Sequence, residues 1–259
     1  MGLLPKLGVN IDHLATLRQL RGTPYPNLLE AVKLIELSGA SQITVHLRED
    51  RRHIQPEDVK LLKAHSNLPL NLEMAVTPEM VKFAKKISPE WVCLVPEKRQ
   101  EVTTEGGLAI KKNYARIHDA MTVLKKAGIK VSLFVEPSVD AMKQSWKLGA
   151  DAVELHTGTF CLAAQSSPTG ELSKKAESQL GRIQKAGELA ASLGLRVHAG
   201  HGIDLENVRF LAALTRKNPA KKSVPLIEEY NVGHFLICRA ALVGMEQAVR
   251  EMVSAIQAP

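Results

Sequence analysis

The segment from Ile43 to His53 combines side chains that can transfer protons with side chains that can bind anions. It opens with β-branched residues, which pack well in strands, and it then carries two imidazoles and three guanidiniums, on His46, Arg48, Arg51, Arg52 and His53. Imidazole exchanges protons near neutral pH, and guanidinium binds phosphate through paired hydrogen bonds. Catalytic groups of α/β proteins lie at the carboxyl ends of strands, so we expect this segment to form part of an active site. The alternative is a strand followed by a solvated charged loop.

Polar side chains also lie at the ends of other predicted strands. They are Asn10, Asp12 and His13 at or after Lys6–Asn10, Glu73 near the end of Leu68–Met74, Glu154 in Ala152–Leu155, and His201 after Arg196–Ala199. His46, His201, Glu73 and Glu154 form an acid–base set that suits a reaction with several proton transfers. Taken alone, a glutamate at a strand end is more commonly a salt-bridge partner than a catalyst.

Glycines next to histidines predict phosphate binding. Gly200-His201-Gly202 follows the predicted seventh strand, and Gly233-His234 lies at or before the start of the predicted eighth strand, Tyr230–Cys238. Barrels commonly bind phosphate there through backbone N–H groups, although ordinary turn glycines are the alternative. Arg48, His53 and Thr103 indicate a second anion site. Two phosphate sites on one face suggest that the protein joins two phosphorylated molecules.

Other functional classes find little support in the sequence. No histidine pair or CxxC has the spacing of metal ligands, and no cluster rich in Asp is present, so we expect no metal and no other cofactor. The net charge of +7 permits nucleic-acid binding, but no basic run is interleaved with aromatic residues, so we expect no nucleic-acid partner. We find no apolar run of membrane length and no signal peptide. The three widely spaced cysteines fit a reducing compartment, so we expect a cytoplasmic protein with no membrane contact.

Alternation of strands and helices predicts the fold. The chain has 259 residues and a core poor in aromatic residues, and eight strand–helix units follow one another without a clear linker. This pattern predicts a (β/α)₈ TIM barrel with extra helices, in one domain spanning residues 1–259. A doubly wound open sheet is the alternative, and it is weakened because no G-x-G-x-x-G follows the first strand.

Several segments outside the strands are also assigned. Asn27 is expected to cap the helix Leu28–Ser38, and Thr77 to cap Glu79–Ile87. Pro96–Gly107, with its paired glycines, has the composition of a mobile lid. We expect irregular loops at Phe160–Gly170 and Arg216–Pro225, a single closing helix at Ala240–Ala258, and buried thiols at Cys93 and Cys238.

Six stretches together resemble the pyridoxine 5′-phosphate synthase family of the deoxyxylulose-phosphate-dependent vitamin B6 pathway. They are Gly8–His13, Ile43–His53, Asn71–Val76, Leu94–Gly107, Glu154–Gly158 and Ala199–Gly202. The resemblance implies a (β/α)₈ barrel assembled as a homo-octamer. It also implies that 3-amino-2-oxopropyl phosphate and 1-deoxy-D-xylulose 5-phosphate condense to close a pyridine ring, with release of phosphate and water. Segments 159–180 and 216–225 look longer or more basic than the family pattern.

The resemblance also implies roles for individual residues. His46 and Glu73 would be proton acceptors, His201 a proton donor and Glu154 a transition-state stabiliser. The aminoketone phosphate would be held by Asn10, Arg21, Gly202, Gly233 and His234. The deoxyxylulose phosphate would be held by Asp12, His13, Arg48, His53 and Thr103. A single-substrate isomerase or aldolase acting on a phosphorylated sugar is the rival, and an imine-forming aldolase would need a lysine at a strand end, which we do not find.

Overall fold

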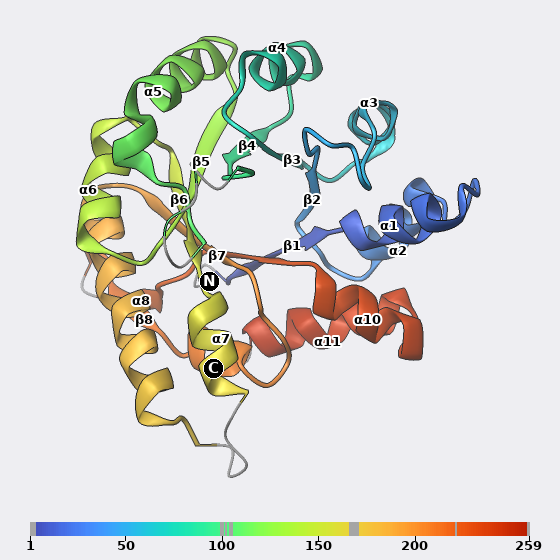
Figure 1. Ribbon diagram of the computed structural model, residues 1–259. Helices are drawn as coiled ribbons and strands as arrows, with labels where there is room; N and C mark the ends of the chain where they lie inside the picture. The colour runs from blue at the N-terminus through green and yellow to red at the C-terminus, as the bar shows by residue number, and fades with distance from the viewer. Residues whose placement is uncertain are drawn as a thin grey trace.

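Eight parallel strands close into a barrel, which confirms the predicted fold class (Figure 1). The structure is a computed structural model that describes residues 4–98, 101, 103, 106–165, 171–220 and 222–257. The order around the barrel is β1-β10-β7-β6-β5-β4-β3-β2, so the chain runs once around it and β10 pairs with β1 to close it. Every strand of the barrel therefore ends on the same face, which brings together side chains far apart in the sequence.

The barrel strands are short, and helices cover their outer side. The strands are β1 (Lys6–Asn10), β2 (Gln42–His46), β3 (Leu70–Met74), β4 (Trp91–Leu94), β5 (Lys130–Val135), β6 (Ala152–His156), β7 (Arg196–Gly200) and β10 (Glu229–Val232). The helices are α1 (Asp12–Arg21), α2 (Leu28–Leu37), α3 (Pro56–His65), α4 (Pro78–Ile87), α5 (Ile110–Lys126), α6 (Val139–Lys147), α7 (Gly158–Ala164), α8 (Lys174–Ser192), α9 (Val208–Ala212), α10 (His234–Val243) and α11 (Met245–Gln257). Two helices instead of one follow β1, β6 and β10, and these supply the predicted extra helices. No helix among the described residues is both long and apolar enough to cross a membrane.

Side-chain capping sets where several helices begin. The Asn27 Oδ1 accepts hydrogen bonds from the backbone N–H groups of Leu29 and Glu30, as expected for the cap of α2. The Thr77 hydroxyl accepts from Met80 N–H at the start of α4. These contacts satisfy backbone donors that have no partner within the helix. Both capping predictions are confirmed.

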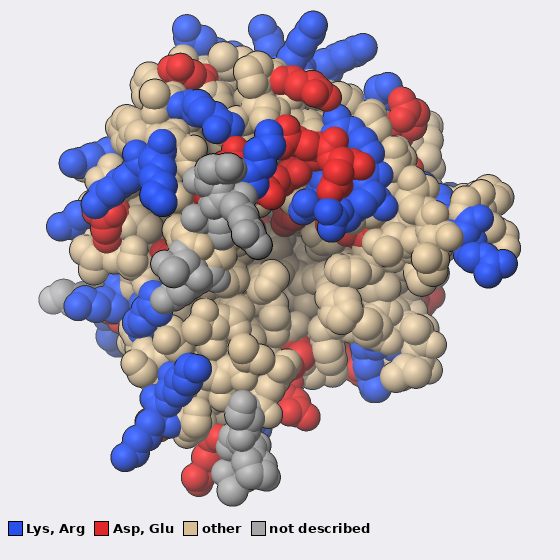
Figure 2. Space-filling view, viewed as in Figure 1, with Lys and Arg blue, Asp and Glu red and all other residues tan. Residues whose placement is uncertain are grey.

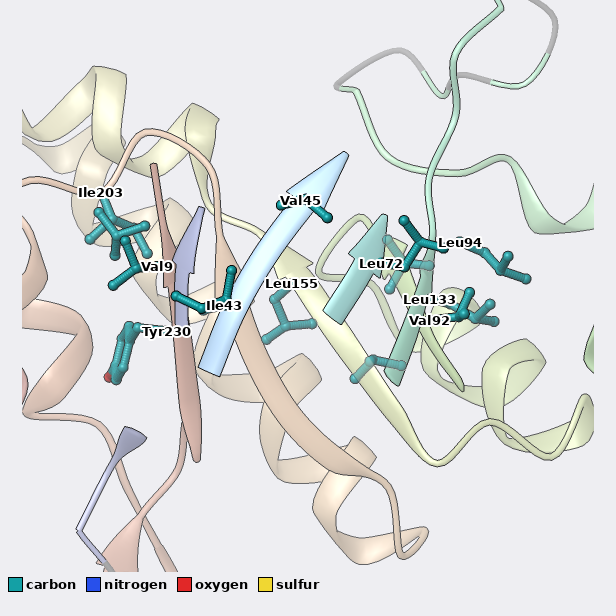
Figure 3. Close-up of a cluster of buried hydrophobic side chains, with 14 of the residues drawn as sticks. Val9, Ile43, Val45, Leu72, Val92, Leu94, Leu133, Leu155, Ile203 and Tyr230 are labelled. Atoms are coloured by element: carbon teal, nitrogen blue, oxygen red, sulfur yellow. The ribbon is translucent and has the colours of Figure 1, made fainter. Parts of the chain in front are cut away.

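The strands alternate between an apolar outer row and a polar inner row. Ile43, Val45 and Leu72 belong to the hydrophobic core (Figure 3). Thr44 and Asn71 alternate with them and are hydrogen-bonded to each other across neighbouring strands, at 3.4 Å. The interior of many barrels is filled by branched aliphatic residues, but here most of the inner row is polar. Polar groups buried in this way must find partners.

The end of the chain differs from its sequence-based prediction. β10 ends at Val232, so Gly233 and His234 follow the eighth barrel strand, and the prediction that they lie at or before its start was wrong. The apolar run after His234 resembles a strand but forms the first turns of α10, and Cys238 is exposed instead of buried. The predicted single closing helix is also wrong, because Gly244, with φ +86°, separates α10 from α11.

Two predicted loops contain regular structure. Gly158–Ala164 forms α7, which buries Phe160, so the irregular loop predicted at Phe160–Gly170 was wrong where the structure describes it; residues 166–170 lie outside the described residues. The predicted loop at Arg216–Pro225 contains an antiparallel pair, β8 (Thr215–Lys217) and β9 (Ser223–Pro225). A helix of seven residues and strands of three residues are too short to give a clear periodic pattern.

Candidate active site

A cavity of about 750 Å³ opens at the carboxyl ends of the barrel strands. All of the predicted site residues except Arg21, His53 and Thr103 line it. They come from β1, β2, β3, β6 and the segments after β7 and β10, as expected if the barrel closure gathers the strand ends. The volume is within the usual range for sites that bind small molecules.

The three remaining predicted residues lie outside this lining. Arg21 is exposed at the end of α1. The ring centroid of His53 is 6.2 Å from that of His46. The Nδ1 atom of His53 accepts a hydrogen bond from Ile54 N–H. Thr103 donates its hydroxyl hydrogen to Glu136 Oε1 at 3.1 Å. Much of the predicted lid around Thr103, namely residues 99, 100, 102, 104 and 105, lies outside the described residues.

His46 is held between two carboxyl groups. Its Nε2 lies 3.0 Å from Glu97 Oε1, and its Nδ1 lies 3.9 Å from Glu73 Oε2. Its backbone N–H donates to Asp12 Oδ1 at 2.8 Å, which ties the end of β2 to the start of α1. A fixed imidazole with a carboxyl group on each side is suited to receive and return protons.

Two glutamates of the cavity favour the protonated state. Burial raises the pKa of Glu154 to about 7, although the Asn231 amide opposes the shift. Burial, together with the negative charges of Glu154 and Asp12, raises the pKa of Glu73 well above its ordinary value. Burial also raises the pKa of Asp12 to about 6. A carboxyl group with a pKa near neutrality can hold or release a proton at the pH of the cell.

This arrangement predicts a cost in stability that depends on pH. The pKa of Glu154 is about 7 in the folded protein against 4.5 ordinarily, so the folded state binds the proton more tightly. The unfavourable contribution is absent below pH 4.5, grows as the pH rises and is complete above about pH 7. We expect Glu154→Gln to raise the free energy of unfolding by roughly 3 kcal/mol at pH 8, and by little near pH 4.5.

Urea unfolding at pH 5 and pH 8 measures this difference. Glu57→Gln is the matched control, because 76% of the Glu57 side chain is exposed. A stability gain for Glu154→Gln that is the same at both pH values, or a loss at pH 8, would contradict the prediction.

His201 lines the same cavity in a restricted backbone conformation. Its φ is +78°, a region that residues with side chains rarely adopt. A Cβ atom on Gly158 would come within 2.7 Å of the His201 ring, so only glycine leaves room for the imidazole there. Burial and the neighbouring His156 lower the pKa of His201, and the two ring centroids are 4.9 Å apart. Strain of this kind is concentrated at functional sites.

The charged segment after β2 divides into two parts. Arg48 lines the cavity, whereas Arg51 pairs with Glu79 and Arg52 pairs with Asp50. Figure 2 shows acidic and basic side chains gathered on this face of the molecule. The solvated-loop alternative therefore holds for Arg51 and Arg52, which are engaged in surface ion pairs.

Sequence reasoning missed several polar residues of the site. Glu97 contacts His46, Asn231 contacts Glu154 at 2.8 Å, and the ring of His156 lies beside that of His201 at an angle of 51°. Asn231 could have been found from the alternation of Glu229 and Asn231 with apolar residues, had the eighth strand been started one residue earlier. Glu97 lies in an irregular segment and carries no periodic signal.

The structure also brings together three possible metal ligands. Asp12, His46 and Glu73 each place one donor atom within 4.8 Å of the others. The sequence showed no such group, because the three residues come from β2, β3 and the start of α1. Asp12 Oδ1 already accepts a hydrogen bond from the His46 backbone N–H, and His46 Nε2 already contacts Glu97, whereas His46 Nδ1 faces Glu73.

Comparison with known proteins identifies the family. The sequence profile described as "Pyridoxal phosphate biosynthesis protein PdxJ" matches residues 7–258. The chain belongs to this family. Pyridoxine 5′-phosphate synthase from Bdellovibrio bacteriovorus is 49% identical over 249 residues, which cover 95% of this chain and 96% of that protein. The synthase from Geobacter metallireducens is 49% identical over 254 residues, which cover 98% of this chain and 99% of that protein. This member of the pyridoxine 5′-phosphate synthase family is an enzyme of pyridoxine biosynthesis, as the resemblance implied.

Solved structures of other enzymes share the fold of this family member. KGPDC from Streptococcus mutans aligns with a TM-score of 0.62 and 13% identity, covering 98% of this chain and 97% of that one. Phosphoribosylanthranilate isomerase from Thermotoga maritima aligns with a TM-score of 0.58 and 11% identity, and the alignment covers 99% of this chain and 100% of that one. At these identities the likeness concerns the barrel alone.

Proposed function

We propose that the enzyme condenses 3-amino-2-oxopropyl phosphate with 1-deoxy-D-xylulose 5-phosphate to form pyridoxine 5′-phosphate, releasing phosphate and water. The observation that carries the proposal is the acid–base set in one cavity. Glu73 and Glu154 have raised pKa values, and His46 and His201 line the same cavity. Ring closure requires several proton transfers, and Glu154, whose pKa is about 7, can hold or release a proton near neutral pH.

Two groups of residues are proposed to hold the two phosphorylated substrates. Asn10, Gly202, Gly233 and His234 would hold the aminoketone phosphate. In support, Gly233 precedes the first turn of α10, where backbone N–H groups favour an anion. Asp12, His13, Arg48, His53 and Thr103 would hold the sugar phosphate. Because Thr103 contacts Glu136 in this structure, its role would need the segment 96–107 to move over the bound substrate.

The proposed contact of Arg21 with the substrate requires a second copy of the chain. It is exposed outside the cavity, so its proposed contact with the aminoketone phosphate would have to be made in an oligomer. Leu17, Leu20 and Tyr25 are 54%, 77% and 67% exposed around it, and apolar exposure of this extent favours an interface. We therefore propose that α1 packs against another copy within a homo-octamer.

The chemistry would proceed through an imine. The substrate amine attacks the ketone of the sugar phosphate, and water leaves. Glu73 then accepts a proton and His201 donates one during enolisation and loss of phosphate. His46 serves the addition of water or the ring-closing aldol step, and Glu154 stabilises the transition state. Closure of the segment 96–107 would exclude bulk water from the imine.

The proposed reaction needs no metal ion and no other cofactor. Protonated side chains supply the charge stabilisation, and Asp12 Oδ1 and His46 Nε2 are engaged with neighbouring protein groups. We expect the rate to be unchanged after dialysis against a chelator. Restoration of lost activity by a divalent ion would contradict this part of the proposal.

A requirement for both substrates tests the function itself. We expect no turnover with either phosphorylated substrate alone and formation of pyridoxine 5′-phosphate when both are present, detected by mass spectrometry. Conversion of one substrate alone would favour the rival single-substrate isomerase or aldolase. None of the described residues lining the cavity is a lysine, so an aldolase that forms an imine with the protein would lack its nucleophile.

A further inference from the structure

The side-chain amide of Asn231 lies between Thr44 and Glu154 inside the barrel. Its Nδ2 donates to Glu154 Oε2 at 2.8 Å, and its Oδ1 accepts from the Thr44 hydroxyl at 3.0 Å. Thr44, Glu154 and Asn231 are 0%, 3% and 6% exposed. Water therefore has little access to replace either contact.

The hydrogen bonds from Asn71 through Thr44 and Asn231 to Glu154 all have the donor on the same side of each contact. Asn71 Nδ2 donates to the Thr44 oxygen at 3.4 Å, so the Thr44 hydroxyl hydrogen is available for Asn231. With its Oδ1 occupied as an acceptor, the Asn231 amide presents its NH₂ group to Glu154. A carbonyl oxygen at this position would require a protonated carboxyl group, whereas an NH₂ group favours the ionised one.

Neighbouring strands leave room for this arrangement. A Cβ atom on Gly8 would lie 2.1 Å from Asn231 Oδ1, and a Cβ atom on Gly200 would lie 2.3 Å from Glu154 Oε1. Both glycines stand in register with Asn231, on β1 and β7. The space for the amide and the carboxyl group is thus built from two positions where any side chain would collide.

We infer that Thr44 and Asn231 are positioning residues that hold the Glu154 carboxyl group in one orientation and favour its ionised form. This inference rests on the proposed function of Glu154 in the condensation. Thr44 lies behind Asn231 and acts through it, and Asn231 acts through Glu154.

The groups that neighbouring strands place beside Glu154 provide no positive charge among the residues that the structure describes. Glu73 on β3 and Glu229 on β10 are acidic, and Cys93 on β4 lies with its Sγ 3.9 Å from Glu154 Oε2. The register partner on β7 is His198, whose pKa burial lowers to about 3, so that its ring is neutral. On β5 the register partner is the uncharged Phe134. A neutral donor such as Asn231 is therefore the main support that an ionised Glu154 has.

The test compares Thr44→Val with Thr44→Ser. Valine keeps the shape and removes the hydroxyl donor, so the Asn231 amide can turn its oxygen toward Glu154. For Thr44→Val we expect the acidic limb of the pH profile of kcat/KM to move to higher pH by about one unit. At pH values on the acidic side of that limb, this shift corresponds to about a tenfold loss of kcat/KM. Serine retains the donor and should keep the limb at its wild-type position.

Unfolding free energies between pH 5 and 8 give a second readout that needs no substrate. The decline in stability should still begin near pH 4.5, the ordinary pKa of the glutamate, but should extend to higher pH in Thr44→Val and end at the wild-type pH in Thr44→Ser. Unchanged pH dependence in Thr44→Val, or the same shift in both variants, would overturn the inference. If the wild-type enzyme forms no product but the stability shift is present, the proposed function fails while the positioning of Glu154 stands.

Discussion

Glu73→Gln is expected to lower turnover by roughly 10²–10⁴-fold while leaving the barrel folded. Glutamine has nearly the shape of a protonated glutamic acid, and the raised pKa of Glu73 means that the folded protein already favours that form. The variant can never form the carboxylate that would accept a proton beside His46, and the raised pKa makes that carboxylate a stronger base whenever it forms. Because burial of a charge is also avoided, its stability at pH 8 should be no lower than that of the wild type.

Steady-state kinetics with both substrates and urea unfolding measure the two parts of this prediction. Glu57→Gln, on the exposed side of α3, is the control and should keep full activity. Turnover within threefold of the wild type would show that Glu73 accepts no proton in the rate-determining chemistry. A loss of turnover with an equal loss of stability would instead assign Glu73 a structural role.

Gly8→Ala is expected to destabilise the protein by about 1–3 kcal/mol and to disturb the site as well. The added methyl group would lie 2.1 Å from Asn231 Oδ1, and Asn231 cannot retreat without breaking its hydrogen bonds to Thr44 and Glu154. Displacement of Asn231 should therefore shift the pH profile in the same direction as Thr44→Val.

Gly181→Ala is the control for Gly8→Ala. Gly181 lies in α8, and nothing stands within 4 Å of a Cβ atom there. Alanine should stabilise that helix by about 0.5–1 kcal/mol. In the double variant Gly8→Ala/Asn231→Ala the collision is removed, so the cost of Gly8→Ala should be smaller in that background. Equal costs in the two backgrounds, measured by urea unfolding, would contradict the proposed collision.

The barrel could be predicted because its signals are local. The alternation in Leu70–Met74 and the cap at Asn27 each depend on a few neighbouring residues. Once eight parallel strands are expected, closure places their ends together, and the location of His46, Glu73 and Glu154 follows from topology. The resemblance added the substrates, which no pattern in the sequence could provide.

The remaining features depend on contacts between distant strands. The pairing of Asn231 with Glu154 spans 77 positions and requires β10 to lie beside β7, which pairs with β6. The pairing of Asn231 with Thr44 spans 187 positions and requires β10 to close against β1, which pairs with β2. The run after His234 is apolar enough to resemble a strand, and only packing makes it a helix. Arg21 illustrates a third limit, because it is exposed outside the cavity and its proposed contact with a second copy of the chain has no counterpart in the pattern of one sequence.

The stoichiometry of the complete reaction decides whether the enzyme joins the two phosphorylated substrates. Purified enzyme, both phosphorylated substrates and a chelator are combined, and pyridoxine 5′-phosphate and inorganic phosphate are measured in the same samples. We expect one phosphate to be released for each pyridine ring formed, at a rate that the chelator does not change. Release of phosphate without ring formation, or no product although each substrate binds alone, would contradict it and assign the cavity to a different reaction.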